Sequence, residues 1–185
     1  MLIKTIIKKC YLMMYRNKLK QLGKNFEFNF PICFRNPQYI SIGNDCYLGT
    51  NCRIEAWDQY NDLDYRPEIV IGNSVKINST CHIGAINKVI IGDNCLLGSY
   101  VMIIDHAHGK SNLQEAYIHP SKRDLYSKGC VKIGSFCWLC ENVVVLPGVT
   151  IGKGTIVGAN AVVTEDLPEY CVAVGNPAKV VKYLK

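Results

Sequence analysis

Apolar residues recur every six positions along most of the chain. The first position of each unit is Ile, Leu or Val and the second is often Gly. Blocks align from Ile42 (IGNDCY LGTNCR IEAWDQ), Ile71 (IGNSVK INSTCH IGAINK), Ile91 (IGDNCL LGSYVM IIDHAH) and Ile133 (IGSFCW LCENVV VLPGVT IGKGTI VGANAV). We predict that each unit forms a short strand and a corner, with its first side chain pointing inward and the glycine relieving the turn.

Three units are expected to close one triangular coil. This arrangement places Ile133 under Ile151, and Leu139 under Val157, in the following coil. Each coil can bury its apolar side only against the next, as in other solenoid proteins. The pattern therefore predicts a stack of β-coils, most regular from Ile133 through Val163.

Two stretches interrupt the six-residue period, at 56–68 (AWDQYNDLDYRPE) and at 107–130 (AHGKSNLQEAYIHPSKRDLYSKGC). A stacked coil tolerates insertions only at its corners, so both stretches are predicted to project as loops. Long loops in a compact repeat are usually functional.

Residues 1–24 follow a different pattern and are predicted to form a basic amphipathic helix. An apolar stripe recurs at helical spacing, comprising Ile3, Ile6, Ile7, Cys10 and Met14. The longest apolar run, YLMMY, is far too short to span a membrane, and we expect no signal peptide. The helix either packs on the body or a neighbouring subunit, or lies on an anionic membrane surface. We favour packing, because Cys10, Met13 and Met14 are less bulky than the Trp, Phe and Leu of most interfacial helices.

The charge of the chain is concentrated in this segment. The net charge is +6, and residues 1–24 hold seven basic residues and no acidic one, which leaves 14 basic and 15 acidic residues in the remainder. A near-neutral body is not expected to follow a phosphate backbone, which argues against a nucleic-acid partner. With 185 residues and 49% hydrophobic content, the body is one folded domain rather than a disordered chain.

Ten cysteines at first suggest a disulfide framework. Five of them occupy the fifth position of a unit, where other units carry Val, Thr or Ala: Cys46, Cys52, Cys81, Cys95 and Cys137. There a thiol acts as a small hydrophobic side chain. The chain is too long for a stapled mini-domain, and so many thiols favour a reducing cytoplasm.

The segment IIDHAHGKSN places Asp105, His106 and His108 behind a predicted strand. Adjacent residues of an extended segment face opposite sides, so Asp105 is a doubtful partner for His106, whereas His108 can share its face. A zinc site needs about three converging imidazoles. His82 lies at a predicted corner, where a solvated histidine is the default, and we expect no metal site.

Beyond these patterns, the sequence resembles a known family over residues 33–182. The repeats, the segment WLCENVVVLPGVTIGKGTIVGANAVVTEDLP and the following AVGNPAKVV are similar to the hexapeptide-repeat acyltransferases, in the maltose, galactoside and polysaccharide O-acetyltransferase branch. The resemblance implies an all-β fold, a left-handed parallel β-helix over residues 25–185 that ends in a C-terminal tail. It also implies acetyl-CoA as co-substrate, without a required metal, and a homotrimer with active sites at subunit interfaces.

The resemblance also implies roles for individual residues. His106 corresponds to the general base that takes a proton from an acceptor hydroxyl, as a base with a pKa near 7 can do. Asn78 corresponds to an acceptor-site residue, and His108 is a candidate for substrate contact. The coenzyme A contacts correspond to Trp138, Glu141, Ala159, Thr164, Glu165 and Lys179.

Three positions depart from the family pattern. Many relatives carry a hydroxyl at Glu141 and a basic residue at Glu165, where an acid would repel the phosphates. Some sugar acetyltransferases carry a second acid where this chain has Ala85. Acceptor recognition is therefore expected to differ from that of the galactoside and maltose enzymes.

The predicted function is acetyl-CoA-dependent O-acetylation, through a ternary complex, of a sugar or of a polysaccharide or lipopolysaccharide precursor in the cytoplasm. N-acetylation of an amino sugar or of a nucleotide-linked amino sugar is the main alternative. From other classes, a γ-type carbonic anhydrase and a non-catalytic β-helix also remain open. The helix at 1–24 leaves membrane-surface contact as a further possibility.

Overall fold

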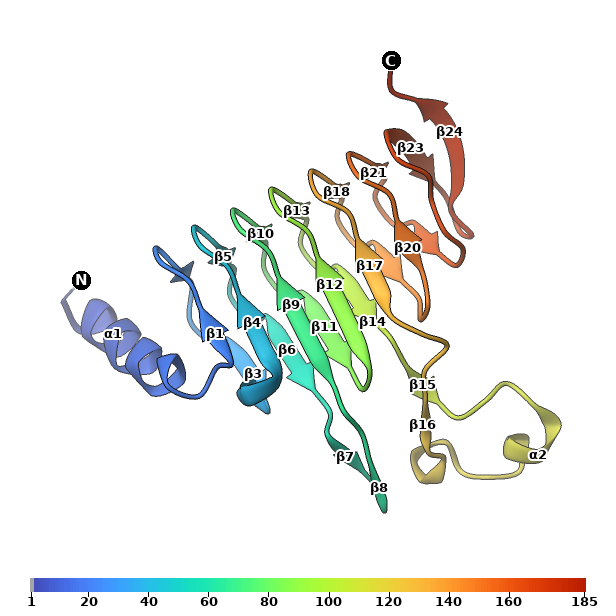
Figure 1. Ribbon diagram of the computed structural model, residues 1–185, viewed down its shortest axis with the longest axis horizontal. Coiled ribbons are helices and arrows are strands. Elements are labelled where there is room, and N and C mark those ends of the chain that lie inside the picture. Colours follow the sequence, from blue (N-terminus) through green and yellow to red (C-terminus); the bar gives the residue numbers. More distant parts are fainter. Residues whose placement is uncertain (1) are drawn as a thin grey trace.

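Short parallel strands stack into a three-sided prism along the long axis of the molecule (Figure 1). The structure is a computed structural model that describes the backbone of residues 2–185 and the side chains from Ile7 onward. The β-helix is left-handed. The predicted all-β fold of hexapeptide repeats with a short N-terminal helix is confirmed.

Each face of the prism is one sheet that receives one strand from every coil. The first face holds β1 (Gln21–Leu22), β4 (Ile40–Ile42), β9 (Glu68–Ile71), β12 (Lys88–Ile91), β17 (Val131–Ile133) and β20 (Thr150–Ile151). The second holds β2 (Glu27–Phe28), β5 (Tyr47–Leu48), β10 (Lys76–Ile77), β13 (Leu96–Leu97), β18 (Trp138–Leu139), β21 (Ile156–Val157), β23 (Cys171–Val174) and the antiparallel β24 (Lys179–Tyr183). The third holds β3 (Cys33–Arg35), β6 (Arg53–Ala56), β11 (His82–Ala85), β14 (Met102–Ile104), β19 (Val144–Val145) and β22 (Val162–Val163).

The stacking register follows the repeat. Ile133 pairs with Ile151, and Leu139 pairs with Val157, as predicted. These first-position side chains are at most 2% exposed and fill the interior of the prism. A continuous apolar core therefore runs through the coils, and each coil is held by those above and below it.

The glycine at the second position has a different role from the one predicted. The left-handed backbone of the corners falls on the fourth position instead, for example at Asp45 (φ 58°), Asn94 (φ 58°) and Asn142 (φ 57°). A Cβ added at Gly134 would lie 2.6 Å from the backbone nitrogen of Lys153 in the next coil. At units such as this one, the second position is glycine because the backbone of the neighbouring coil approaches too closely for a Cβ.

The fifth-position cysteines lie inside two of the three corners of the prism. The corner between the first and second faces holds Cys46, Cys95 and Cys137, and the corner between the second and third faces holds Cys52 and Cys81. All five are buried, and each thiol donates to a backbone carbonyl of the following coil at 3.0–3.1 Å. Thr155 makes the equivalent bond to the carbonyl of Pro168 at 2.6 Å. The cysteines therefore act as small buried side chains that also satisfy a corner carbonyl.

Both insertions project from the same edge of the prism (Figure 1). The first forms the hairpin of β7 (Gln59–Tyr60) and β8 (Leu63–Asp64), and the second contains β15 (Ala107–His108), α2 (Leu113–Ala116), a 3-10 turn at Pro120–Lys122 and β16 (Leu125–Tyr126). The Tyr60 hydroxyl donates to the carbonyl of Ser121 at 2.8 Å, and the Tyr65 hydroxyl accepts from the amide of Leu125 at 3.0 Å. The two loops thus support each other beside the coil that lies between them.

The helix α1 (Leu2–Arg16) covers the first coil (Figure 1), and a 3-10 turn at Pro37–Tyr39 precedes β4. Tyr11, Leu12 and Tyr15 pack against the core, with the rings of Tyr15 and Phe34 5.0 Å apart. The stripe that we expected to make this contact does not: Ile7 is 47% exposed and Met14 is 45% exposed. Ile3 and Ile6 lie outside the described side chains. No helix within residues 2–185 is both long and apolar enough to cross a membrane.

Candidate active site

A cavity of about 200 Å³ opens on the third face of the prism, at the base of the two loops. The strand β6 supplies Arg53 and Glu55, β11 supplies His82, and the segment after β14 supplies His106. The loops add Trp57, Tyr60, His108 and Leu125. Three stacked coils and the two loops therefore bring charged, imidazole and aromatic groups to one place.

His106 is held by a buried carboxylate. Asp105 is fully buried, and its carboxylate accepts from the backbone amides of Ile86 at 2.9 Å and Asn87 at 2.8 Å. The same Oδ1 lies 2.9 Å from Nδ1 of His106. Because a carboxylate only accepts hydrogen bonds, Nδ1 carries the proton and Nε2 is left as the basic nitrogen.

The expected opposition of Asp105 and His106 is therefore wrong. The strand β14 ends at Ile104 and the chain bends at Asp105, so the alternation of an extended segment no longer applies. Ile86 and Asn87 form the tight corner between β11 and β12, in the coil between those that carry the loops. Asp105 caps this corner and orients His106 at the same time.

His82 is not a solvated corner histidine. It begins β11, and its side chain, 28% exposed, donates from Nε2 to Glu55 Oε2 at 3.0 Å. Arg53 Nη2 lies 3.3 Å from Nδ1 of the same ring and 3.4 Å from Glu55 Oε2. Burial and the Arg53 charge lower the pKa of His82, against the opposing effect of Glu55.

The stacking register could have revealed this cluster. Arg53 pairs with His82 across β6 and β11, and Glu55 pairs with Gly84. A Cβ added at Gly84 would lie 3.4 Å from Cε1 of His106 and 3.5 Å from Nε2 of His82. Gly84 therefore forms the floor between the two imidazoles. The sequence signal for this cluster was a set of polar residues at outward positions that stack on one another. Because the sequence interpretation considered His82 alone, it did not predict the cluster.

Aromatic rings form the outer wall of the cavity. The guanidinium of Arg35 lies 3.5 Å from the ring centroid of Trp57 and fixes that side chain by a cation–π contact. The rings of Tyr60 and His108 meet edge to face, 5.3 Å apart. His108 thus lies on the same side as His106, as expected, although it is exposed and belongs to the loop.

The other predicted site residues lie elsewhere on the surface. Asn78 is half-buried at the corner between β10 and β11, Trp138 is 47% exposed on β18, and Ala85 faces the core. Exposed positions on the last coils hold Glu141, Ala159, Thr164, Glu165 and Lys179. Among the described residues that line the cavity, none belongs to this group.

An ion pair changes the electrostatics expected near the last coils. Lys179 Nζ lies 3.3 Å from Glu165 Oε2, and both side chains are largely exposed. Glu165, which would repel a phosphate, is therefore paired with Lys179, the cation that would attract one. From Leu2 to Lys185, no cluster of three or more His, Cys, Asp and Glu side chains is arranged to hold a metal ion.

The protein families that match this chain are defined by the same six-residue repeat. The family described as bacterial transferase hexapeptide (six repeats) matches residues 130–165, and the hexapeptide repeat of succinyl-transferase matches 39–54 and 88–103. WbbJ of Escherichia coli (strain K12), provisionally named a lipopolysaccharide biosynthesis O-acetyl transferase, is 39% identical over 157 residues, which cover 83% of this chain and 76% of that protein. The chain belongs to the hexapeptide-repeat acetyltransferase family.

The similarity to other members of this acetyltransferase family is less complete. SAR2635 of Staphylococcus aureus (strain MRSA252), provisionally named an acetyltransferase, is 36% identical over 121 residues, 65% of this chain and 58% of that protein. A maltose O-acetyltransferase structure from Clostridium difficile 630 matches with 26% identity and a TM-score of 0.65, covering 94% of this chain and 74% of that one.

A structure of a variant of AntD from Bacillus cereus, an N-acyltransferase in complex with dTDP-4-amino-4,6-dideoxyglucose and coenzyme A, matches with a TM-score of 0.75. It covers 94% of this chain and 88% of that one, at 20% identity. At that identity the match shows the shared β-helix fold alone.

Proposed function

We propose that this acetyltransferase transfers an acetyl group from acetyl-CoA to a hydroxyl of a glycan or glycan precursor bound in the cavity. The observation that carries this proposal is the Asp105–His106 pair. A buried carboxylate fixes Nδ1 as the protonated nitrogen, so that Nε2 is available as a base in a cavity lined by polar and aromatic side chains. A hydroxyl is a weak nucleophile at neutral pH, and such a base is the usual remedy.

The acetyl group can pass directly from coenzyme A to the acceptor, without a covalent enzyme intermediate. The acceptor oxygen attacks the thioester carbonyl carbon, a C–O bond forms, and its proton passes to Nε2 of His106. The C–S bond then breaks, and the proton on Nε2 passes to the departing thiolate of coenzyme A. The carboxylate of Asp105, 2.9 Å away, stabilises the imidazolium that exists between these steps.

The walls of the cavity fit a sugar acceptor. Trp57 and Tyr60 offer apolar faces to the C–H groups of a pyranose ring, while Glu55, Arg53 and His82 offer hydrogen-bonding groups to its hydroxyls. The names of WbbJ and of the maltose O-acetyltransferase point to the same acceptor class. His108 remains a candidate for acceptor contact, because its ring meets Tyr60 at this wall. Asn78 does not line the cavity and remains a candidate on the family resemblance alone.

For acetyl-CoA, we propose the exposed surface of the last coils. Trp138 and Ala159 would lie along the pantetheine arm with Glu141, and Thr164, Glu165 and Lys179 near the nucleotide. Lys179 can reach a phosphate only if its ion pair with Glu165 opens. That step costs little, because both groups are largely exposed to water. Since these residues do not line the cavity, a homotrimer that joins the cavity of one subunit to the last coils of another would complete the site.

An acetyl-CoA consumption assay with a panel of acceptors tests the proposal. Free sugars, nucleotide-sugars and lipid-linked glycans are compared, and the product bond is identified by its hydrolysis in mild base. We expect an ester, which mild base releases. An amide product, stable under the same conditions, would show that an amine is the acceptor. Absence of transfer to every sugar acceptor would contradict the proposed substrate class.

A further inference from the structure

The helix α1 has two apolar faces, and only one of them is packed. Tyr11, Leu12 and Tyr15 face the first coil and are partly buried. On the opposite side, Ile7, Met13 and Met14 are 47%, 72% and 45% exposed, and Cys10 between them is exposed as well. We call this second group the outer stripe. A helix packed on a protein body ordinarily presents polar residues on its outer side. The exposed outer stripe therefore indicates an interaction surface.

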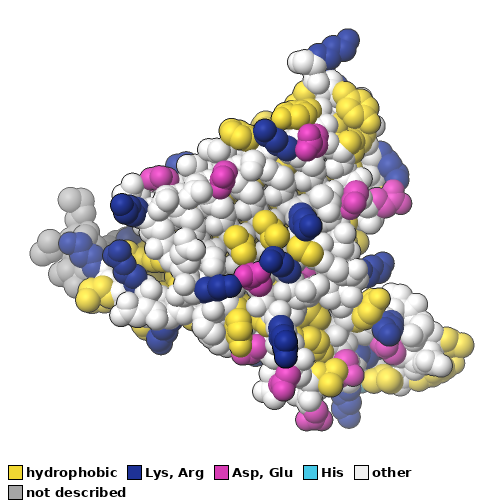
Figure 2. Space-filling view, viewed as in Figure 1, with side chains coloured by type: hydrophobic (Ala, Val, Ile, Leu, Met, Phe, Trp, Pro, Cys, Tyr) yellow, Lys and Arg dark blue, Asp and Glu magenta, His cyan; other side chains and the backbone are white. Residues whose placement is uncertain are grey.

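The positive charge of this segment indicates what kind of surface covers the outer stripe. Residues 1–24 hold seven basic residues and no acid, whereas the rest of the chain is nearly neutral. Lys9 and Arg16 are both exposed on α1, and helical geometry places them together along one border of the outer stripe. Figure 2 shows Lys and Arg side chains among hydrophobic ones at this end of the molecule. An apolar stripe bordered by cations fits a surface that is negatively charged outside and apolar beneath.

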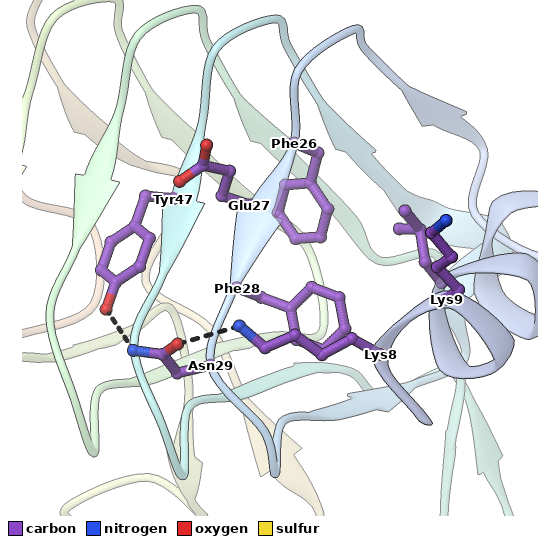
Figure 3. Close-up of a pocket in the computed structure, with 8 residues that line it drawn as sticks. Lys8, Lys9, Phe26, Glu27, Phe28, Asn29 and Tyr47 are labelled. Atoms are coloured by element: carbon purple, nitrogen blue, oxygen red, sulfur yellow. Dashed lines mark hydrogen bonds between the residues drawn. The ribbon is translucent and has the colours of Figure 1, made fainter. Parts of the chain in front are cut away.

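A groove beside α1 repeats the same combination. About 240 Å³ in volume, it lies between the helix and the strands β2 and β5, with Leu12, Phe26 and Phe28 as apolar lining. Figure 3 shows Lys8 reaching across Phe28 to Asn29, which in turn bonds to Tyr47. Lys9 and Glu27 lie at the rim. The groove therefore presents aromatic surface and lysine ammonium groups side by side, as an anionic amphiphile requires.

A second copy of this chain is a poorer occupant. Contact between two or three α1 segments would bring together basic residues that have no acid within 1–24 to compensate them, and like charges at close range repel. The body of a neighbouring subunit is nearly neutral and offers no matching excess of acid. An anionic bilayer surface supplies both the opposing charge and the apolar layer.

We propose that the α1 end of the molecule docks on a bilayer surface that contains anionic phospholipid. The outer stripe enters the headgroup boundary, and Lys9 and Arg16 at its border contact lipid phosphates. This inference is independent of the acetyl transfer proposed above. The site and the docking surface belong to different parts of the prism, since the cavity lies on the third face at the base of the loops. An acetyltransferase held in this way would meet acceptors that are themselves anchored in the membrane.

Flotation with vesicles tests the proposal on the full-length chain. Vesicles of phosphatidylcholine alone are compared with vesicles of phosphatidylcholine and phosphatidylglycerol, at low and high salt. We expect the protein to float only with the anionic vesicles and to be released as salt rises, because screening shortens the reach of surface charges. If the protein does not float with anionic vesicles, or floats equally with neutral ones, the proposal is wrong.

Two double variants separate charge from apolar contact. Each surface cation contributes about a fivefold factor to binding at an anionic surface, so Lys9→Glu with Arg16→Glu is expected to weaken partitioning by roughly 25-fold or more. Ile7→Gln with Met14→Gln is expected to weaken it without lowering Tm, since these side chains are not packed. The matched control is Lys153→Glu with Lys182→Glu, an equal change of charge on exposed residues near the opposite end.

Each outcome of this comparison either supports or overturns docking through α1. Loss of flotation in both α1 variants and retention in the control support docking through α1. Equal loss in the control would show attraction by net charge alone and would overturn the proposal. A fall in oligomer mass of the Ile7→Gln, Met14→Gln variant in light scattering would assign the outer stripe to a subunit contact and would also overturn it.

Discussion

At the scale of single residues, the site depends on one carboxylate with two functions. Asp105 closes the corner at Ile86 and Asn87 through their amides and fixes the tautomer of His106 through the remaining hydrogen bond. The carboxylate has three hydrogen-bond partners, so its burial leaves no side-chain oxygen unpaired. The proposed base, His106, is thus oriented by a group that also contributes to the fold.

We expect His106→Ala to reduce the turnover number by about 100-fold or more, within the usual contribution of general base catalysis. The fold should persist, because Asp105 keeps its two bonds to the amides of Ile86 and Asn87. The matched control is His119→Ala, an exposed histidine of the second loop whose side chain bonds to Ser121. A His106→Ala enzyme that retained more than half of the wild-type turnover would contradict the assigned role.

The pH dependence of stability should reflect His82. Its pKa is lower in the folded protein than in the unfolded chain, because burial and Arg53 disfavour the charged imidazole. The unfolded state therefore binds more protons below about pH 6.5, and stability falls as the pH drops through that value towards the folded pKa. The fall in Tm between neutral and mildly acidic pH should be smaller for His82→Gln than for wild type. An unchanged or steeper fall would show that other groups dominate this pH range.

At the scale of elements, close contact between coils sets the sequence requirements. The second position of a unit faces the backbone of the next coil, and the fourth position takes the left-handed conformation. The fifth position holds a small buried side chain, and where this is Cys or Thr it donates to a corner carbonyl. These three constraints explain why Gly, Asn or Asp, and Cys recur in this order.

We expect Gly134→Ala to lower the free energy of unfolding by about 1–3 kcal/mol, the usual cost of overpacking. The added Cβ would lie 2.6 Å from the backbone nitrogen of Lys153, and that backbone belongs to a strand–corner unit that has little freedom to move. Denaturant titration measures the change, with the exposed neighbour Lys132→Ala as control. A loss no larger than that of the control would mean that the coils separate there at little cost.

At the scale of the whole molecule, the chain presents the base and the predicted coenzyme A residues on separate surfaces. His106 lines the cavity at the loop base, while Trp138 and Lys179 lie on the last coils. The two loops project from the prism (Figure 1), and their residues Tyr60 and His108 line the cavity. This separation is the reason for proposing that a neighbouring subunit completes the site.

We predict a homotrimer of about 62 kDa, three times the chain mass of 20.7 kDa. Light scattering at micromolar concentration measures this mass, and mixing His106→Ala with a Trp138→Ala variant provides a functional check. Mixed trimers should regain part of the activity if one site draws on two subunits. A monomeric mass, or strictly additive activity after subunit exchange, would contradict a shared site.

The sequence by itself determined the coil, its register and the loops. A six-residue period with an inward apolar residue has one way to bury that residue, and insertions can leave such a stack only at a corner. The same pattern explains the five corner cysteines, since the fifth position of a unit takes a small apolar side chain. His106 and the coenzyme A residues came from family resemblance, and their roles remain predictions.

Only the tertiary structure decided the composition of the cavity. Arg53 and Glu55 lie far from His82 and His106 in sequence, and they meet because parallel stacking places β6, β11 and β14 side by side. The Asp105–His106 contact depends on a local bend that overrides strand alternation, and the exposure of Ile7 and Met14 depends on which face of α1 meets the first coil. A periodic pattern specifies what must be buried inside a coil. The outward side chains are free of that constraint, so their meeting is set by geometry in three dimensions.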